Sequence, residues 1–148
     1  MLRRHERFRS KPYLDTVGVP TFGYGFTYIT KAEADMILNG RVAELYRSCA
    51  TRWEWFEDLC DIRKLIIMDM AYNLGIEGLA NFKRMIAAIE GGRWADASAE
   101  MLSSRWATQV GSRARELAGM MMLPGEQVVQ LKASIRQAEL EAQKEHIN

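Results

Sequence analysis

Cysteine and histidine are both scarce in this sequence of 148 residues, which contains only two of each. Cys49 and Cys60 lack the short C-x-x-C spacing of zinc and redox sites, and two histidines offer few further ligands. We therefore expect no metal site. We interpret both cysteines as free thiols, because disulfides are rare in cytosolic proteins.

Long apolar runs are also missing. None approaches the roughly 20 consecutive residues that a membrane-spanning helix needs. The first six residues, MLRRHE, carry charges where a signal peptide has its apolar stretch. We therefore expect no stable membrane insertion and no export signal.

A large excess of one charge is absent as well. The net charge is +1, which gives no general reason to expect a nucleic acid partner. The first eleven residues are nonetheless basic, since five of them are cationic against Glu6 alone: Arg3, Arg4, Arg7, Arg9 and Lys11. Such a cluster is usually a solvated helix face, and it would also attract an anionic polymer.

What is present is the composition of a soluble globular protein, with 48% apolar and 26% charged residues. The length suits one domain that can bury a real core without metals or disulfides. Residues 2–9 predict a short helix that ends before Pro12. Between Tyr13 and Tyr28, β-branched and aromatic residues alternate with glycines, which predicts a small β-hairpin.

The remaining chain has helical periodicity, so the predicted fold class is α+β and mostly α. Thr30 and Glu33 form a capping box that starts a helix. Residues 61–74 are apolar around nearly the whole circumference, which predicts one buried central helix stopped by Gly75, and Ser112 is expected to cap a later helix. We expect a single domain, 1–148, with these parts: a hairpin lobe at 13–28, a connecting helix at 30–50, a helical lobe at 61–131 and a C-terminal helical extension at 132–148.

One aromatic segment has two interpretations. Trp53, Trp55 and Phe56 follow one another closely between residues 52 and 59. A platform for carbohydrate is conceivable. We favour a loop that packs its rings onto the core.

The candidate catalytic groups are Glu6, Asp15 and Thr21. Glu6 lies on the predicted N-terminal helix, whereas Asp15 and Thr21 lie on the hairpin. Two carboxyl groups on facing elements suit glycoside hydrolysis, in which one protonates the leaving oxygen and the other activates water or attacks the sugar. On spacing alone, ordinary surface charges remain the simpler explanation of both acids.

Longer motifs add a resemblance to a known family. The segment LDTVGVPTFGYG, residues 14–25, resembles the active-site hairpin of the phage lysozymes in glycoside hydrolase family twenty-four, and the spacing from Glu6 to Asp15 to Thr21 is also similar. A second block follows in the family's order: YNLG at 72–75, SRW at 104–106, Gln109 and SRA at 112–114. The resemblance extends from residue 1 to about 131, and two ordered blocks are a specific signal.

The resemblance implies a lysozyme-like fold and assigns roles to residues. Glu6 corresponds to the general acid, Asp15 to the group that positions or activates the attacking water, and Thr21 to a group that helps to hold that water. Arg113 corresponds to a supporting arginine beside the catalytic glutamate. The implied substrate-binding positions are Gly25, Tyr72, Asn73, Arg105 and Gln109, although Tyr72 and Asn73 equally suit packing and capping of the central helix.

The implied activity is that of a peptidoglycan-degrading endolysin. It would hydrolyse the β-1,4 bond between N-acetylmuramic acid and N-acetylglucosamine with inversion at the anomeric carbon, and it would need no cofactor. We expect a monomer whose partner is bacterial peptidoglycan and not nucleic acid. It would collect in the host cytoplasm and reach the periplasmic cell wall after holin-type release.

Three residues depart from the family pattern. Arg7 replaces the usual glycine after the catalytic glutamate, and Phe22 and Phe26 replace an aliphatic residue and a histidine. A cation beside Glu6 favours its ionised form, which weakens it as an acid, whereas burial would oppose this effect. The connection from Thr27 to Thr30 is also short.

These departures leave an alternative, a muramidase-fold protein with impaired catalysis that binds peptidoglycan or a protein. A lytic transglycosylase is less favoured, because such an enzyme has no need of a positioned water and this sequence keeps Asp15 and Thr21.

Overall fold

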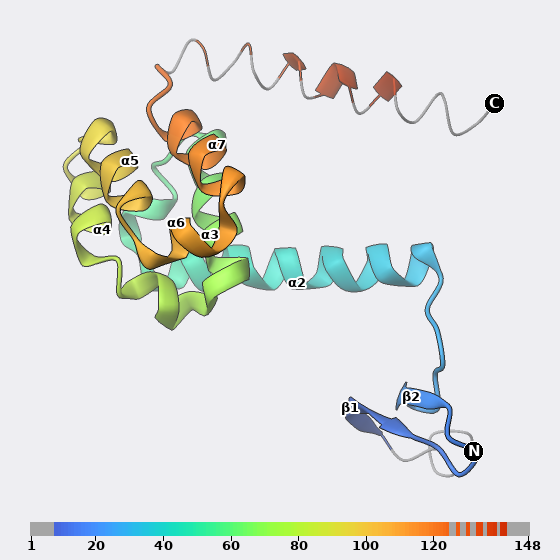
Figure 1. Ribbon diagram of the computed structural model, residues 1–148. Coiled ribbons are helices and arrows are strands. Elements are labelled where there is room, and N and C mark those ends of the chain that lie inside the picture. The colour runs from blue at the N-terminus through green and yellow to red at the C-terminus, as the bar shows by residue number, and fades with distance from the viewer. Residues whose placement is uncertain are drawn as a thin grey trace. The chain divides into compact units, whose positions relative to one another are not determined.

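The computed structural model describes residues 8–124 and, beyond them, Gln127, Gln130, Ala133, Ser134, 136–138, Leu140 and Glu141 (Figure 1). Two compact units follow each other along the chain, residues 1–43 and residues 44–148. Glu6, Arg7 and most of the predicted extension at 132–148 lie outside the described residues. The structure is mostly helical with one small two-stranded sheet, which confirms the predicted fold class.

The sheet of the first unit is an antiparallel hairpin. Strand β1 (Arg9–Leu14) pairs with β2 (Pro20–Gly23), and Tyr13 lies opposite Thr21. The hairpin was predicted, but it begins earlier than residue 13. The helix expected over residues 2–9 cannot reach Arg9, because this residue already belongs to β1. Pro12 lies within the strand, where its fixed φ and its effect on the preceding residue favour extended backbone.

Helix α2 (Lys31–Arg52) begins where the capping box predicted. The backbone N–H of Glu33 donates to Thr30 Oγ1 at 3.2 Å, and the backbone N–H of Thr30 donates to Glu33 Oε2 at 2.8 Å. The helix continues to Arg52 rather than ending near residue 50. The boundary between the two units falls within it, after Ala43.

The second unit is organised around α3 (Asp61–Ala80). Gly75 has φ 74° and ψ 163°, a conformation that favours glycine, and it interrupts the helix as the sequence predicted. Beyond Gly75, however, the chain forms one further helical segment that ends at Ala80. Most apolar side chains of α3 are buried. Leu65 and Tyr72 are about half exposed, so the burial does not extend around the whole circumference.

Four shorter helices follow α3 in the continuously described part of this unit: α4 (Lys83–Glu90), α5 (Trp94–Leu102), α6 (Arg105–Val110) and α7 (Ser112–Met121). Helix α5 packs against α4 and α7, and α7 also packs against α3. Ser112 is the first residue of α7 and not its cap. Gly111 takes the capping position with φ 61° and ψ −116°, a conformation that favours glycine, and its N–H donates to the carbonyl of Ala107.

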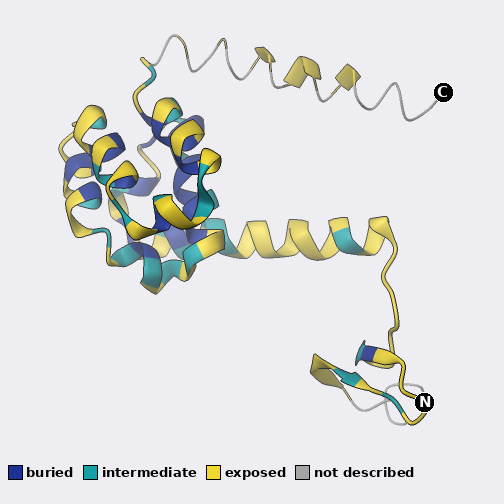
Figure 2. Cartoon of the chain, in the orientation of Figure 1, coloured by how far each residue is buried: buried dark blue, intermediate teal, exposed yellow. Residues whose placement is uncertain are grey.

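The core lies in the second unit, where Figure 2 shows the buried residues gathered among the short helices. Trp53 and Phe56 are buried around the short helix η1 (Glu54–Phe56), which confirms that this segment packs rings onto the core. Cys49 is buried, Cys60 is half-buried and both are free thiols. Within the described residues, no helix is both long and apolar enough to cross a membrane. The largest fully buried side chains are those of Cys49, Phe56, Ile62, Ile66, Ile67, Met70, Leu79, Met85, Met101 and Met121.

Candidate functional site

Asp15 lies at the turn between the two strands, where its side chain helps to build the turn. Its Oδ1 accepts the backbone N–H groups of Val17 at 2.9 Å and Val19 at 2.8 Å. Aspartate is favoured at such positions because its short side chain can replace a backbone acceptor in a turn. These two bonds fix the carboxylate through one oxygen. The other oxygen, Oδ2, accepts no hydrogen bond from the described residues.

Thr21 is held beside the same turn. It is buried, and its hydroxyl donates to the backbone carbonyl of Val19 at 3.0 Å. Val19 therefore contacts both predicted water-handling residues, with its N–H bonded to Asp15 and its C=O bonded to Thr21. Because the Thr21 hydroxyl is used as a donor, its lone pairs remain able to accept a hydrogen bond from water.

Gly25 lies in the turn after β2 and has φ 89°, a value that favours glycine. The turn is closed by two backbone hydrogen bonds between Phe22 and Phe26, at 2.9 and 2.8 Å. The rings of these two residues lie 6.0 Å apart, and the ring of Phe26 passes so close to Gly23 that a side chain there would collide with it. Phe22 and Phe26, which both depart from the family pattern, thus pack against each other within the hairpin.

A second group of predicted residues gathers in the helical unit. Asn73 on α3 accepts the indole N–H of the buried Trp106 on α6, with 3.1 Å between Oδ1 and Nε1. This bond ties α3 to α6, so the packing interpretation of Asn73 has direct support. Tyr72, its neighbour, is half exposed.

Arg105 and Gln109 are one helical turn apart on α6 and therefore share a face. They line a pocket of about 450 Å³ together with Leu74, Phe82 and Trp106. The aromatic rings of Phe82 and Trp106 meet edge to face, with centroids 6.4 Å apart. Two of the predicted substrate-binding residues thus line one pocket, and Asn73 holds the tryptophan of its wall.

Arg113 on α7 forms a two-point ion pair with Asp69 on α3. Nε lies 2.8 Å from Oδ1, and Nη2 lies 2.5 Å from Oδ2. These hydrogen bonds raise the pKa of the Arg113 guanidinium above its usual value. The pair orients the guanidinium and offsets its charge.

Asp69 was not predicted from the sequence as a functional residue. A possible signal was its place in a helix whose buried positions are mostly apolar, since an acid there needs a partner. Ser104 was identified as part of the SRW motif but not as a cap; its hydroxyl caps α6 by accepting the N–H of Ala107 at 3.1 Å. Ser104 precedes the SRW motif residues Arg105 and Trp106, so a capping pattern could have revealed this role.

Comparisons with known proteins agree with the resemblance. The family model described as phage lysozyme matches residues 3–122. The pre-baseplate central spike protein Gp5 of Enterobacteria phage T4 is 28% identical over 159 residues, an alignment that covers 84% of this chain and 27% of that protein. Probable T4-type lysozyme 1 of Dictyostelium discoideum is 32% identical over 62 residues, which cover 42% of this chain and 36% of that protein. The chain thus spans about a third or less of these relatives' lengths.

Proposed function

Because this chain belongs to the phage lysozyme family, we propose that it is a muramidase that hydrolyses the β-1,4 bond between N-acetylmuramic acid and N-acetylglucosamine in bacterial peptidoglycan. The observation that carries the proposal is the arrangement around Val19. One residue of the turn holds both a carboxylate with an unused oxygen and a buried hydroxyl. A water molecule bound by these two groups would be oriented for attack.

In the proposed mechanism, Glu6 protonates the oxygen of the departing sugar as the glycosidic bond breaks. Asp15 accepts a proton from the water through Oδ2 while the water oxygen attacks the anomeric carbon, and Thr21 keeps that water in place. Attack from the face opposite the leaving group inverts the anomeric centre. The two-point contact with Asp69 fixes the guanidinium of Arg113 on its helix, and the supporting role of Arg113 is assigned on the family resemblance alone.

The substrate contacts belong to the same proposal. Arg105 and Gln109 present hydrogen-bonding groups at the pocket beside Trp106, which suits the hydroxyl and acetamido groups of a sugar. Tyr72 and Gly25 are assigned to substrate contact on the family resemblance alone. We propose that the protein acts as a monomer without a cofactor, and that it reaches the cell wall from the host cytoplasm after holin-type release.

Clearing of outer-membrane-permeabilised Gram-negative cells tests this proposal. Wild type should clear the suspension, whereas Glu6→Gln and Asp15→Asn should lose at least a hundredfold in rate, a typical general acid–base contribution. Glu33→Gln is the matched control, since Glu33 caps α2 and has no proposed catalytic role. Comparable clearing by wild type and Glu6→Gln would refute the assignment.

A binding protein with impaired catalysis is the second candidate. The packing of Phe22 against Phe26 favours it, because these side chains add apolar bulk to the hairpin that carries Asp15 and Thr21. Product analysis separates the candidates. Hydrolysis leaves reducing sugar ends, transglycosylation leaves anhydro-muramic ends, and the binding protein would sediment with peptidoglycan but release neither.

A further inference from the structure

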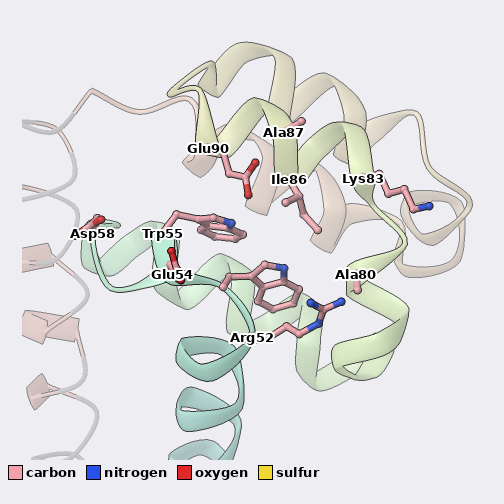
Figure 3. Close-up of a pocket in the computed structure, with 10 residues that line it drawn as sticks. Arg52, Glu54, Trp55, Asp58, Ala80, Lys83, Ile86, Ala87 and Glu90 are labelled. Atoms are coloured by element: carbon pink, nitrogen blue, oxygen red, sulfur yellow. The ribbon is translucent and has the colours of Figure 1, made fainter.

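A second pocket lies in the helical unit, apart from Arg105, Gln109 and Trp106. It has a volume of about 770 Å³ and is formed by the end of α2, helix η1, the end of α3 and helix α4 (Figure 3). Its walls are of two kinds. Trp53, Trp55 and Ile86 supply apolar surface, whereas the other lining side chains are mostly charged.

The indole of Trp55 has an unsatisfied hydrogen-bond donor. Its Nε1 is covered by protein atoms and finds no acceptor among the described residues. A buried donor without a partner costs the folded state free energy, so an acceptor brought to this nitrogen would recover that loss on binding. Figure 3 shows the Trp55 ring extending from η1 toward α4, where Ile86, Ala87 and Glu90 lie.

Five charged side chains line the same pocket. Within the part of the chain that the structure describes, none of them forms an ion pair, although this unit contains four such pairs elsewhere. Arg52 lies over the ring of Trp53 at 5.9 Å. The five are Arg52, Glu54, Asp58, Lys83 and Glu90. Charged side chains that form no ion pair can hydrogen-bond to the hydroxyl groups of a ligand, while the neighbouring aromatic rings pack against its apolar face.

We propose that this pocket is an additional binding site for the glycan strand of peptidoglycan, which recognises an N-acetylated amino sugar without cleaving it. The proposal rests on the proposed muramidase function. The acetamido oxygen accepts the N–H of Trp55 after a side-chain adjustment that uncovers it, and the acetyl methyl group packs on Ile86 and Ala87. The sugar hydroxyls donate to Glu54 and Asp58.

The charge and shape of the pocket favour a sugar over other occupants. Three acids against two bases give no attraction for nucleic acid, and the charged walls do not suit a lipid chain. The volume is large enough for a disaccharide. A second contact with a polymeric substrate raises the effective concentration of the glycan strand at the enzyme. The site would therefore retain the protein on the bacterial cell wall between cleavage events.

The indole signals of the protein provide a direct test, since the four tryptophans each give one N–H cross-peak in a nitrogen-15 NMR spectrum. The Glu6→Gln variant is titrated with the tetramer of N-acetylglucosamine. We expect the Trp55 signal to shift with saturation, while the Trp94 signal, from an indole outside the pocket, stays unchanged. A Trp55 signal that stays fixed while Trp106 shifts would overturn this site and leave the proposed function intact.

A second variant separates binding from folding. Trp55→Phe keeps an aromatic ring against the core but removes the N–H, and a thermal melt checks that it folds like wild type. We expect its binding to purified peptidoglycan to weaken roughly 3- to 10-fold, the range of one neutral hydrogen bond. Cleavage of short soluble fragments should not change. Trp94→Phe is the matched control. Equal binding of peptidoglycan by wild type and Trp55→Phe would refute the proposal. In the NMR titration, a shift of the Trp55 signal on addition of a soluble stem peptide alone would also refute it.

Discussion

At the scale of single residues, the contact between Asp69 and Arg113 has a measurable energy. Both side chains are partly exposed, at 29% and 46%, so solvent weakens the pair. We expect a coupling free energy of about 0.5–1 kcal/mol, near the upper end for exposed pairs because the geometry is bidentate. A double-mutant cycle with Asp69→Ala and Arg113→Ala, followed by urea unfolding, measures it. A coupling of zero would show that the pair contributes nothing to stability.

Cys49 gives the protein a pH dependence at alkaline pH. Burial raises the pKa of its thiol from 9.0 to about 11. Between these two values the unfolded chain loses the thiol proton while the folded chain keeps it. The unfolded state then binds fewer protons, so stability falls as pH rises through this window.

The variant Cys49→Ala lacks this titration and serves as the reference. The difference in unfolding free energy between wild type and variant should be largest below pH 9 and should shrink toward pH 11. Urea unfolding at several alkaline pH values measures the difference. A constant difference across the window would contradict the burial of this thiol.

At the scale of elements, Gly75 determines the break in α3. Its φ of 74° and ψ of 163° are strained for any residue with a side chain, although a Cβ would meet nothing within 4 Å. Gly75→Ala should therefore lower the unfolding free energy by about 1–3 kcal/mol through the backbone alone. Thermal unfolding with circular dichroism would show it.

Gly119 provides the matched control for this prediction. It lies inside α7, and a Cβ there would also meet nothing within 4 Å. Gly119→Ala should stabilise the protein by about 0.5–1 kcal/mol, because alanine is the better helix former. If both variants shift stability in the same direction, the conformation assigned to Gly75 is wrong.

Local sequence signals predicted some element boundaries and missed others. The start of α2 was predictable because Thr30 and Glu33 satisfy each other's backbone groups without help from distant residues. The start of β1 was not, since Ser10 and Lys11 carry no strand signal and lie in the irregular stretch between Arg9, which pairs with Gly23, and Tyr13, which pairs with Thr21. The cap of α7 was missed because Ser112 and Gly111 are both acceptable caps by composition.

At the scale of the whole molecule, the buried core is confined to the second unit. Every member of the core cluster lies between Cys49 and Met121, whereas Thr21 is the one buried residue among residues 8–43. We therefore expect a fragment of residues 44–148 to unfold cooperatively by itself. A fragment of residues 1–43 should remain unfolded, as expected for a chain with so little core.

Thermal scans of the two fragments by circular dichroism test this division. The longer fragment should also be inactive on peptidoglycan, because it lacks Glu6 and Asp15. A long fragment that melts without a transition would show that the helical unit depends on the first 43 residues.

The sequence predicted the parts of the candidate site that depend on short motifs. Asp15 and Thr21 are brought together by a turn that is encoded within a few residues. Asp69 was not predictable in this way, because its partner Arg113 is distant in the sequence and the pair depends on how α3 packs against α7. The pocket at Trp55 likewise requires α4 to lie over η1.

The anomeric form of the first sugar end released from peptidoglycan tests the central claim most directly. Proton NMR during the first minutes of digestion can distinguish the two anomers before they interconvert. Water attack directed by Asp15, with Glu6 protonating the leaving oxygen, predicts that the α-anomer appears first from the β-linked strand. A β-anomer formed first, or an anhydro end in place of a reducing one, would contradict the account.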